Sequence, residues 1–174
     1  FQAEDGIRDC LLSRGLGDVY KRQIQITYLQ NADRNISLPV YETSQSSGMD
    51  LRANLIEDNR VNGISLQAKK WLLIPTGLAI SMPIGYEAQI RPRSGLAFKH
   101  GVSVLNSPGT IDADYRGELG VLLINHGEDE FHINHGDRIA QIVFAPVIQV
   151  VWKQVANLDK SSRDANGFGS TGTT

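Results

Sequence analysis

The sequence predicts an all-β fold, a sandwich or a barrel of short strands. Short runs of alternating or continuous apolar residues recur along the chain, as strands require. Turn-forming residues separate these runs, for example at Asn62-Gly63, Ser107-Pro108-Gly109 and His135-Gly136. Only residues 95–99 have the pattern of a helix, and that helix is short. This arrangement disfavours a parallel sheet covered by helices.

The chain divides into three parts. Residues 1–23 are dense in charge and glycine and keep no strand or helix period. They resemble translated adapter sequence, so we expect a flexible, non-native extension there; a regulatory or targeting arm is the alternative. Residues 24–158 carry the strand-like runs and form the predicted domain, and residues 159–174 form a flexible Gly/Ser/Thr-rich tail.

The individual strands follow from the apolar periodicity. Residues 24–29 alternate apolar and polar side chains, as a half-buried strand does. Residues 102–105 and 110–115 are expected to pair as the arms of a hairpin with its tip at 106–109. The other predicted strands are 71–74, 77–82, 86–91, 120–125, 138–146 and 149–153.

Composition limits the classes of function. The chain has 174 residues, 41% of them hydrophobic, which is enough for one buried core. Its formal net charge of −2 provides no global basic field, so we expect no nucleic-acid partner. The single cysteine, Cys10, excludes an intrachain disulfide and a cysteine-based zinc cluster. No apolar run approaches the roughly 20 residues that span a bilayer, so we expect no membrane association and a cytoplasmic location.

Three places have the residue types that bind phosphate or a cation. Ser94 is expected to cap the short helix, with Gly95 allowing close approach of a ligand and Arg93 offering a planar donor fork. The alternative is an ordinary capped turn. Asp50 alternates out of an apolar strand and could orient a hydrated cation or a neighbouring arginine, or simply be solvated. Gln141, within an apolar run, either bonds a neighbouring backbone or reaches a ligand.

The predicted hairpin carries two carboxylates. On a strand, Asp112 and Asp114 point to one side and Tyr115 to the other, which suits a general base and its support. Edge-strand charges that deter aggregation are the alternative. In the tail, Arg163 and interleaved glycines can wrap phosphate, while Phe168 can stack on a planar ring as the tail closes. A frayed terminus is the alternative there.

These places occur together and in one order, and in this they resemble the five motifs of the trimeric dUTPases. The resemblance covers residues 24–174. The matching segments are Gly48-Met49-Asp50-Leu51, Pro92-Arg93-Ser94-Gly95, residues 109–117, Arg138-Ile139-Ala140-Gln141 and residues 166–172.

The resemblance implies a jelly-roll-like antiparallel barrel of the β-clip type that forms a homotrimer with shared active sites. It implies hydrolysis of dUTP to dUMP and pyrophosphate, with Asp112 activating the water that attacks the α-phosphorus. Mg²⁺ would be held mainly by the substrate phosphates, with Asp50 acting on it through water. The substrate contacts implied by the resemblance are Arg93, Ser94, Gly95, Asn106, Thr110, Ile111, Tyr115, Gln141, Arg163, Phe168, Gly169, Ser170 and Thr171.

The last motif departs from the family pattern. Asp164 and Asn166 stand where two glycines are usual, which predicts weaker substrate binding without loss of activity. Two other functions compete with dUTP hydrolysis: a dCTP deaminase-like activity on the same fold, and non-catalytic nucleotide binding. Glycine after Ser94 and aspartate at 112 disfavour deamination, and the presence of Asp112, Tyr115 and Phe168 disfavours a non-catalytic role.

Overall fold

The structure is a computed structural model that describes residues 23–165. The predicted extension at 1–23 therefore lies almost entirely outside the described residues. Within them the fold is nearly all-β, with one α-helix, α1 (Ser94–His100), and one 3₁₀ turn, η1 (Glu57–Asn59). The strands are β1 (Gln25–Tyr28), β2 (Met49–Arg52), β3 (Ile64–Leu66), β4 (Trp71–Ile74), β5 (Leu78–Ser81), β6 (Tyr86–Arg91), β7 (Val102–Val104), β8 (Gly109–Ile111), β9 (Val121–Asn125), β10 (Phe131–Ile133) and β11 (Arg138–Pro146).

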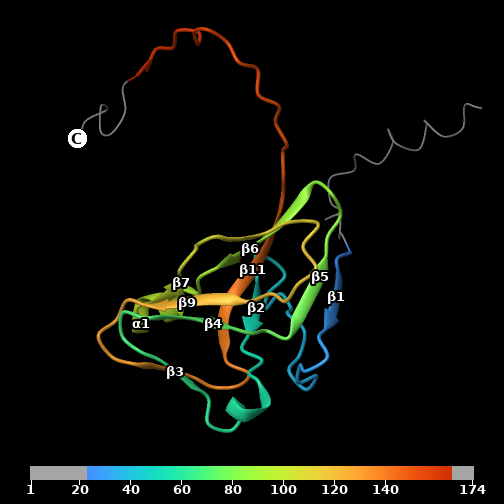
Figure 1. The fold of residues 1–174 in the computed structure, drawn as a ribbon, viewed down its shortest axis with the longest axis vertical. Coiled ribbons are helices and arrows are strands. Elements are labelled where there is room, and N and C mark those ends of the chain that lie inside the picture. Colours follow the sequence, from blue (N-terminus) through green and yellow to red (C-terminus); the bar gives the residue numbers. More distant parts are fainter. Residues whose placement is uncertain (1–22, 166–174) are drawn as a thin grey trace, which may run out of the picture.

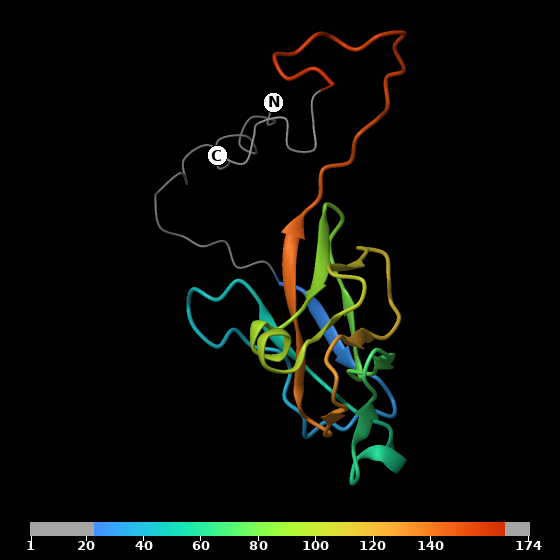
Figure 2. The same ribbon diagram turned by 90° about the vertical axis from the view of Figure 1, so that its left-hand side faces the viewer.

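Every strand pair in the described chain is antiparallel, which confirms the predicted class. A four-stranded sheet has the order β2-β11-β6-β8, and a three-stranded sheet has the order β4-β9-β7. Two pairs, β1-β5 and β10-β3, complete the barrel-like body (Figures 1 and 2). The long β11 runs through the middle of the body, between β2 and β6.

The core lies between the inner faces of these sheets. In β9 the buried residues Val121, Leu123 and Asn125 alternate with half-buried neighbours, as the period of two in a strand requires. Alternation thus assigns one face of β9 to the interior. Fully buried side chains of the core include Leu51, Leu55, Leu66, Ile74, Val102, Leu119, Leu123, Ile133 and Ile139.

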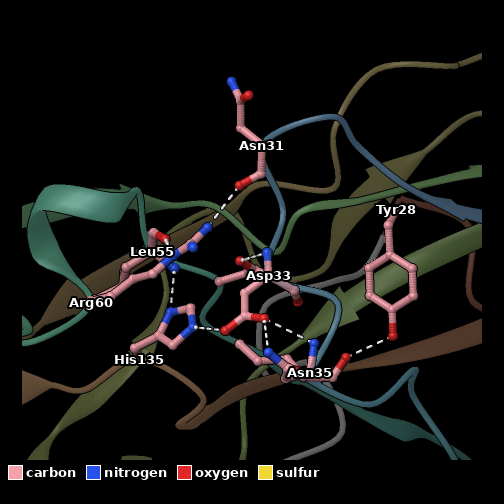
Figure 3. Close-up of polar contacts among 9 residues, drawn as sticks. Tyr28, Asn31, Asp33, Asn35, Leu55, Arg60 and His135 are labelled. Atoms are coloured by element: carbon pink, nitrogen blue, oxygen red, sulfur yellow. Dashed lines mark hydrogen bonds and ion pairs between the residues drawn. The ribbon is translucent and has the colours of Figure 1, made fainter.

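A polar cluster fastens the segment after β1 to the body (Figure 3). His135 Nδ1 accepts a hydrogen bond from the Leu55 N–H at 3.0 Å, so the ring proton lies on Nε2, which faces Asp33 Oδ2 at 3.1 Å. The other carboxylate oxygen of Asp33 accepts bonds from the backbone and side-chain N–H groups of Asn35. The Arg60 guanidinium donates to the carbonyls of Leu55 and Asn31.

Two of the predicted strand features are wrong. Residues 149–153 form no strand; each residue from 146 to 165 is exposed, and this segment runs away from the sheets (Figures 1 and 2). The expected hairpin is also absent, because β7 pairs with β9 whereas β8 pairs with β6. Its two arms belong to different sheets. Two short strands, β3 and β10, were not predicted, since three residues are too few to show a period.

The described part of the chain also bears on membrane association. No helix within residues 23–165 combines the length and the apolar character that crossing a bilayer would need.

Candidate active site

Arg93 lies at the junction between β6 and α1, and its guanidinium is held on two sides. Its Nε donates to Asp50 Oδ1 at 3.0 Å, and its Nη1 donates to the carbonyl of Arg138 at 2.9 Å. The second oxygen of Asp50 accepts from Arg138 Nη1 at 3.2 Å. Three sequence-distant residues therefore form one network in which Asp50 orients an arginine, one of the two roles predicted for it. Arg138 was not singled out by sequence reasoning, although it begins the motif that contains Gln141.

The remaining residues of this region lie close by. Gln141 Nε2 donates to the Pro92 carbonyl at 2.8 Å, so in this structure the side chain bonds a neighbouring backbone. The prediction that Ser94 caps the helix is wrong, because the N-cap is Arg93, in an extended conformation, and Ser94 is the first helical residue. Ser94 and Gly95 thus belong to the first turn of α1, where backbone N–H groups have no partner within a helix.

Asp112 follows directly after β8, in a turn. The Tyr115 N–H donates to the Asp112 carbonyl at 3.1 Å, so the segment bends immediately. Asp112 and Asp114 are therefore not on one strand face, as predicted, but in a turn whose side chains are exposed. Arg116 Nη1 donates to the carbonyls of Ala113 and Tyr115 and holds this turn together.

A cavity of about 780 Å³ adjoins the turn. Asp112 lines it, and so do other charged and polar side chains. These are Tyr86, Glu87, Asp114, Arg116 and Gln149. The cavity is large enough for a small ligand, and the Asp112 carboxylate is open to water within it.

The loop from β7 to β8 contains the other predicted substrate contacts. Asn106 is exposed and lies beside Gly109, where an added Cβ would be 3.2 Å from Asn106 Nδ2. Thr110 is exposed and Ile111 half-buried on β8. Asn106 therefore precedes β8, Thr110 and Ile111 lie on it, and Asp112 follows it.

The structure places the two groups of site residues far apart. In the order β2-β11-β6-β8, Asp50 on β2 and Asp112 after β8 lie on opposite edges of one sheet. Asp50 is level with Arg91, and Ile111 is level with Ala88, so the two groups are also displaced along the strands. With about 4.8 Å between strands and about 3.3 Å per residue, the separation is on the order of 20 Å.

The tail provides few described contacts. Arg163 is exposed, whereas Phe168, Gly169, Ser170 and Thr171 lie outside the described residues. Asp164, which stands in place of a usual glycine, has a φ of 45°, in the left-handed region that favours glycine. Its N–H donates to Ser161 Oγ at 2.9 Å.

No group of three His, Cys, Asp or Glu residues suited to a metal ion occurs within residues 23–165. Both oxygens of Asp50 already accept from arginines. Each carboxylate oxygen has a further lone pair, so Asp50 can still bond a metal-bound water. The residues therefore fit Mg²⁺ held mainly by a phosphate-bearing ligand, and not by a protein cage.

Comparison with known proteins identifies relatives over most of the chain. A family model described as dUTPase matches residues 34–172. Deoxyuridine 5'-triphosphate nucleotidohydrolase of Maricaulis maris is 58% identical over 138 residues, which is 79% of this chain and 89% of the relative. The enzyme of the same name from Brucella melitensis is 56% identical over 140 residues, covering 80% and 87% of the two chains.

Solved structures show the same fold. The dUTPase of Staphylococcus bacteriophage 80alpha with dUPNHPP superimposes with a TM-score of 0.75 at 25% identity, over 87% of this chain and 99% of that one. A mutant dUTPase from phage phi11 of S. aureus has a TM-score of 0.67 at 23% identity, over 80% and 100% of the chains. That structure reveals the coordination of a structural Mg(II) ion.

Proposed function

The chain belongs to the dUTPase family, and on this premise we propose that Asp112 directs the water that splits dUTP. The reaction is hydrolysis of dUTP to dUMP and pyrophosphate. Water attacks the α-phosphorus, the bond from that phosphorus to the α,β-bridging oxygen breaks, and pyrophosphate leaves. The observation that carries the proposal is the exposed Asp112 carboxylate at the end of β8, lining a cavity within a segment that matches the family.

Asp112 contributes mainly by position. A carboxylate is a weak base at neutral pH, so proton removal alone supplies little of the rate. An aspartate fixed in a turn can instead hold the water in line with the scissile bond, which is worth far more. The bond from the Tyr115 N–H and the two bonds from Arg116 make that turn rigid.

Arg93, Ser94, Gly95 and Gln141 form the phosphate-binding part of the site. Arg93 is oriented by Asp50 and still has donors on Nη2 for phosphate oxygens. Asp50 would accept a hydrogen bond from a water on Mg²⁺, and the ion would supply positive charge beside the phosphates. Arg163 and the tail residues Phe168, Gly169, Ser170 and Thr171 would close over the base and the outer phosphates.

The separation of Asp112 from Arg93 supports a site shared between subunits. The separation of about 20 Å is that between Asp112 and Asp50, which holds Arg93, so a triphosphate cannot meet both Asp112 and this network within one chain. A homotrimer would remove this difficulty of distance, because the phosphate-binding residues of one chain would then face Asp112 of another.

Exposed apolar residues also support assembly. On one face of the β4-β9-β7 sheet, Trp71 and Leu73 are about 60% exposed, opposite Ile124 and Leu122. Ile148, Val151 and Trp152 in the segment after β11 are about 90% exposed. Large apolar side chains exposed to this extent are typical of an interface between proteins.

The proposed activity belongs to nucleotide metabolism. Removing dUTP keeps uracil out of DNA, and the product dUMP is the precursor of dTMP. A substrate drawn from the nucleotide pool agrees with the cytoplasmic location predicted from the sequence.

A pyrophosphate-release assay with Mg²⁺ and dUTP, dCTP, dTTP or UTP tests the proposal. We expect release from dUTP alone, and Asp112→Asn should lower kcat by at least about a hundredfold, since water positioning is lost. Asp58→Asn, which removes the same charge from an exposed position on η1, is the control. Ammonia released from dCTP would indicate a deaminase, and nucleotide binding without turnover would indicate a non-catalytic protein.

A further inference from the structure

We propose that Gly117 and Glu118 fix the ring of Tyr115 and thereby set the preference for deoxyribose over ribose. The inference rests on the proposed function, because it takes Tyr115 as the residue that packs under the sugar. It assigns roles to two residues that follow this tyrosine. Both are positioning residues, acting through the ring.

The Tyr115 ring lies against the backbone of Gly117. A Cβ added to Gly117 would be 2.6 Å from Tyr115 Cζ and 3.0 Å from Cε2, and closer still to the hydroxyl oxygen. Side chains do not approach this closely, so any residue larger than glycine must displace the ring. The ring therefore packs directly against Gly117.

The hydroxyl end of the ring is tethered. Tyr115 Oη donates to the Glu118 carbonyl at 3.0 Å, and Glu118 Oε1 accepts from the Gly77 N–H at 2.7 Å. The next residue, Leu119, donates its N–H to the Leu78 carbonyl at 2.8 Å. The tether thus ends on β5, in the body of the fold.

The other end of the same loop holds Asp112. Because Tyr115 N–H donates to the Asp112 carbonyl, the ring and the catalytic carboxylate share one short turn. Tyr115 is 44% exposed, so part of the ring is open to a ligand while its hydroxyl end lies against Gly117. The contacts of the ring thus hold it in one position relative to the Asp112 carboxylate.

Ring position matters because sugar discrimination of this kind is steric. A ring held against C2′ contacts deoxyribose and leaves no space for a 2′-hydroxyl. If the ring tilts, a deoxynucleotide loses that contact and binds more weakly. A ribonucleotide does not make the contact, so its affinity does not fall. The partly exposed ring is also the part that yields most easily to a Cβ at Gly117, so the change should alter selectivity and leave folding intact.

The test measures, for six variants, the inhibition constants of dUDP and UDP against dUTP hydrolysis, together with kcat and KM. One of them, Tyr115→Ala, removes the ring itself. We expect Gly117→Ala and Glu118→Ala each to lower the preference for dUDP over UDP about tenfold, since small steric mismatches are worth that much. Tyr115→Phe, which removes only the hydroxyl tether, should lower it in the same direction. Glu118→Gln keeps an oxygen acceptor for the Gly77 N–H and should restore the preference. Glu57→Ala, an exposed position on η1, is the matched control.

The outcomes are distinguishable. Unchanged preference in Gly117→Ala, Tyr115→Phe and Glu118→Ala would overturn the proposal, as would a Glu118→Gln variant no better than Glu118→Ala. Melting temperatures close to that of the unchanged protein, together with lost preference, would support a positioning role. If Tyr115→Ala keeps the preference, the ring does not select the sugar and this proposal fails while dUTP hydrolysis stands. If the unchanged protein does not hydrolyse dUTP, the proposed function fails instead.

Discussion

At the scale of single residues, the proposed binding of phosphate depends on how the Arg93 side chain is oriented. The Arg93 side chain has several rotatable torsions that must be fixed for the proposed binding of phosphate, and ordering a side chain of this kind costs about 2 kcal/mol. Asp50 and the Arg138 carbonyl fix it in advance through bonds of 3.0 Å and 2.9 Å. The arginine is therefore oriented before substrate arrives.

Replacing Asp50 tests this orientation. We expect Asp50→Ala to raise KM for dUTP about tenfold at saturating Mg²⁺, because Arg93 then loses its partner and must be ordered by the substrate. Glu42→Ala is the control, since Glu42 meets Arg138 only at 3.7 Å on the surface. If instead KM for dUTP is unchanged and only the Mg²⁺ concentration needed for half-maximal activity rises, Asp50 acts on a water bound to Mg²⁺ and not on Arg93.

Asp164 carries the second prediction at this scale. Its φ of 45° costs an L-residue about 1 kcal/mol that glycine does not incur, and its charge opposes a triphosphate. Asp164→Gly should therefore lower KM for dUTP by about threefold to tenfold, measured by steady-state kinetics. Asp159→Gly removes the same charge elsewhere in the tail, and an equal effect from it would point to charge alone.

At the scale of elements, tertiary contacts fasten segments that lack strand partners. The chain between β1 and β2 contains no strand, and the Asp33 cluster ties it to the β10–β11 turn through His135 (Figure 3). Hydrogen bonds from the Asn35 backbone and from His135 hold the pKa of Asp33 below its ordinary value of 3.8. This cluster makes the stability of the segment depend on pH.

The direction of that dependence follows from the lowered pKa. The folded protein binds the Asp33 proton less readily than the unfolded chain, so the stabilisation is complete above pH 3.8 and is lost as pH falls through the folded value. We expect Asp33→Asn to lower the denaturation midpoint at pH 7, with the difference from the unchanged protein shrinking below pH 3.8. Asp58→Asn should show no such convergence, and a constant Asp33→Asn deficit down to pH 2 would contradict the assignment.

At the scale of the whole molecule, one chain presents two halves of a site. The turn proposed to be catalytic follows the edge strand β8, Asp50 of the proposed phosphate-binding network lies on the opposite edge strand β2, and apolar residues remain exposed on β4 and after β11. Both features find an explanation in the proposed homotrimer, in which apolar surface is covered and the halves from different chains meet.

Introducing a charge into the exposed sheet face tests the assembly. Leu73→Glu should convert the proposed trimer to monomers in sedimentation experiments, because burying an unpaired carboxylate costs several kcal/mol. Activity should fall with it, since each site needs more than one chain. Val61→Glu, at a position 91% exposed and away from that sheet, is the control. A monomeric Leu73→Glu protein with full activity would exclude a shared site.

The sequence by itself determined the all-β class, several of the strands and the location of the motifs. Residues 71–74, 86–91 and 138–146 have the observed strand bounds, because periodicity and turn chemistry depend on near neighbours. Only the tertiary structure decided which strands pair, and it separated the expected hairpin arms into two sheets. It also brought Asp50 to Arg93 and Arg138, which are 43 and 88 residues away. Contacts at such separations depend on the packing of the whole chain, which local patterns do not encode.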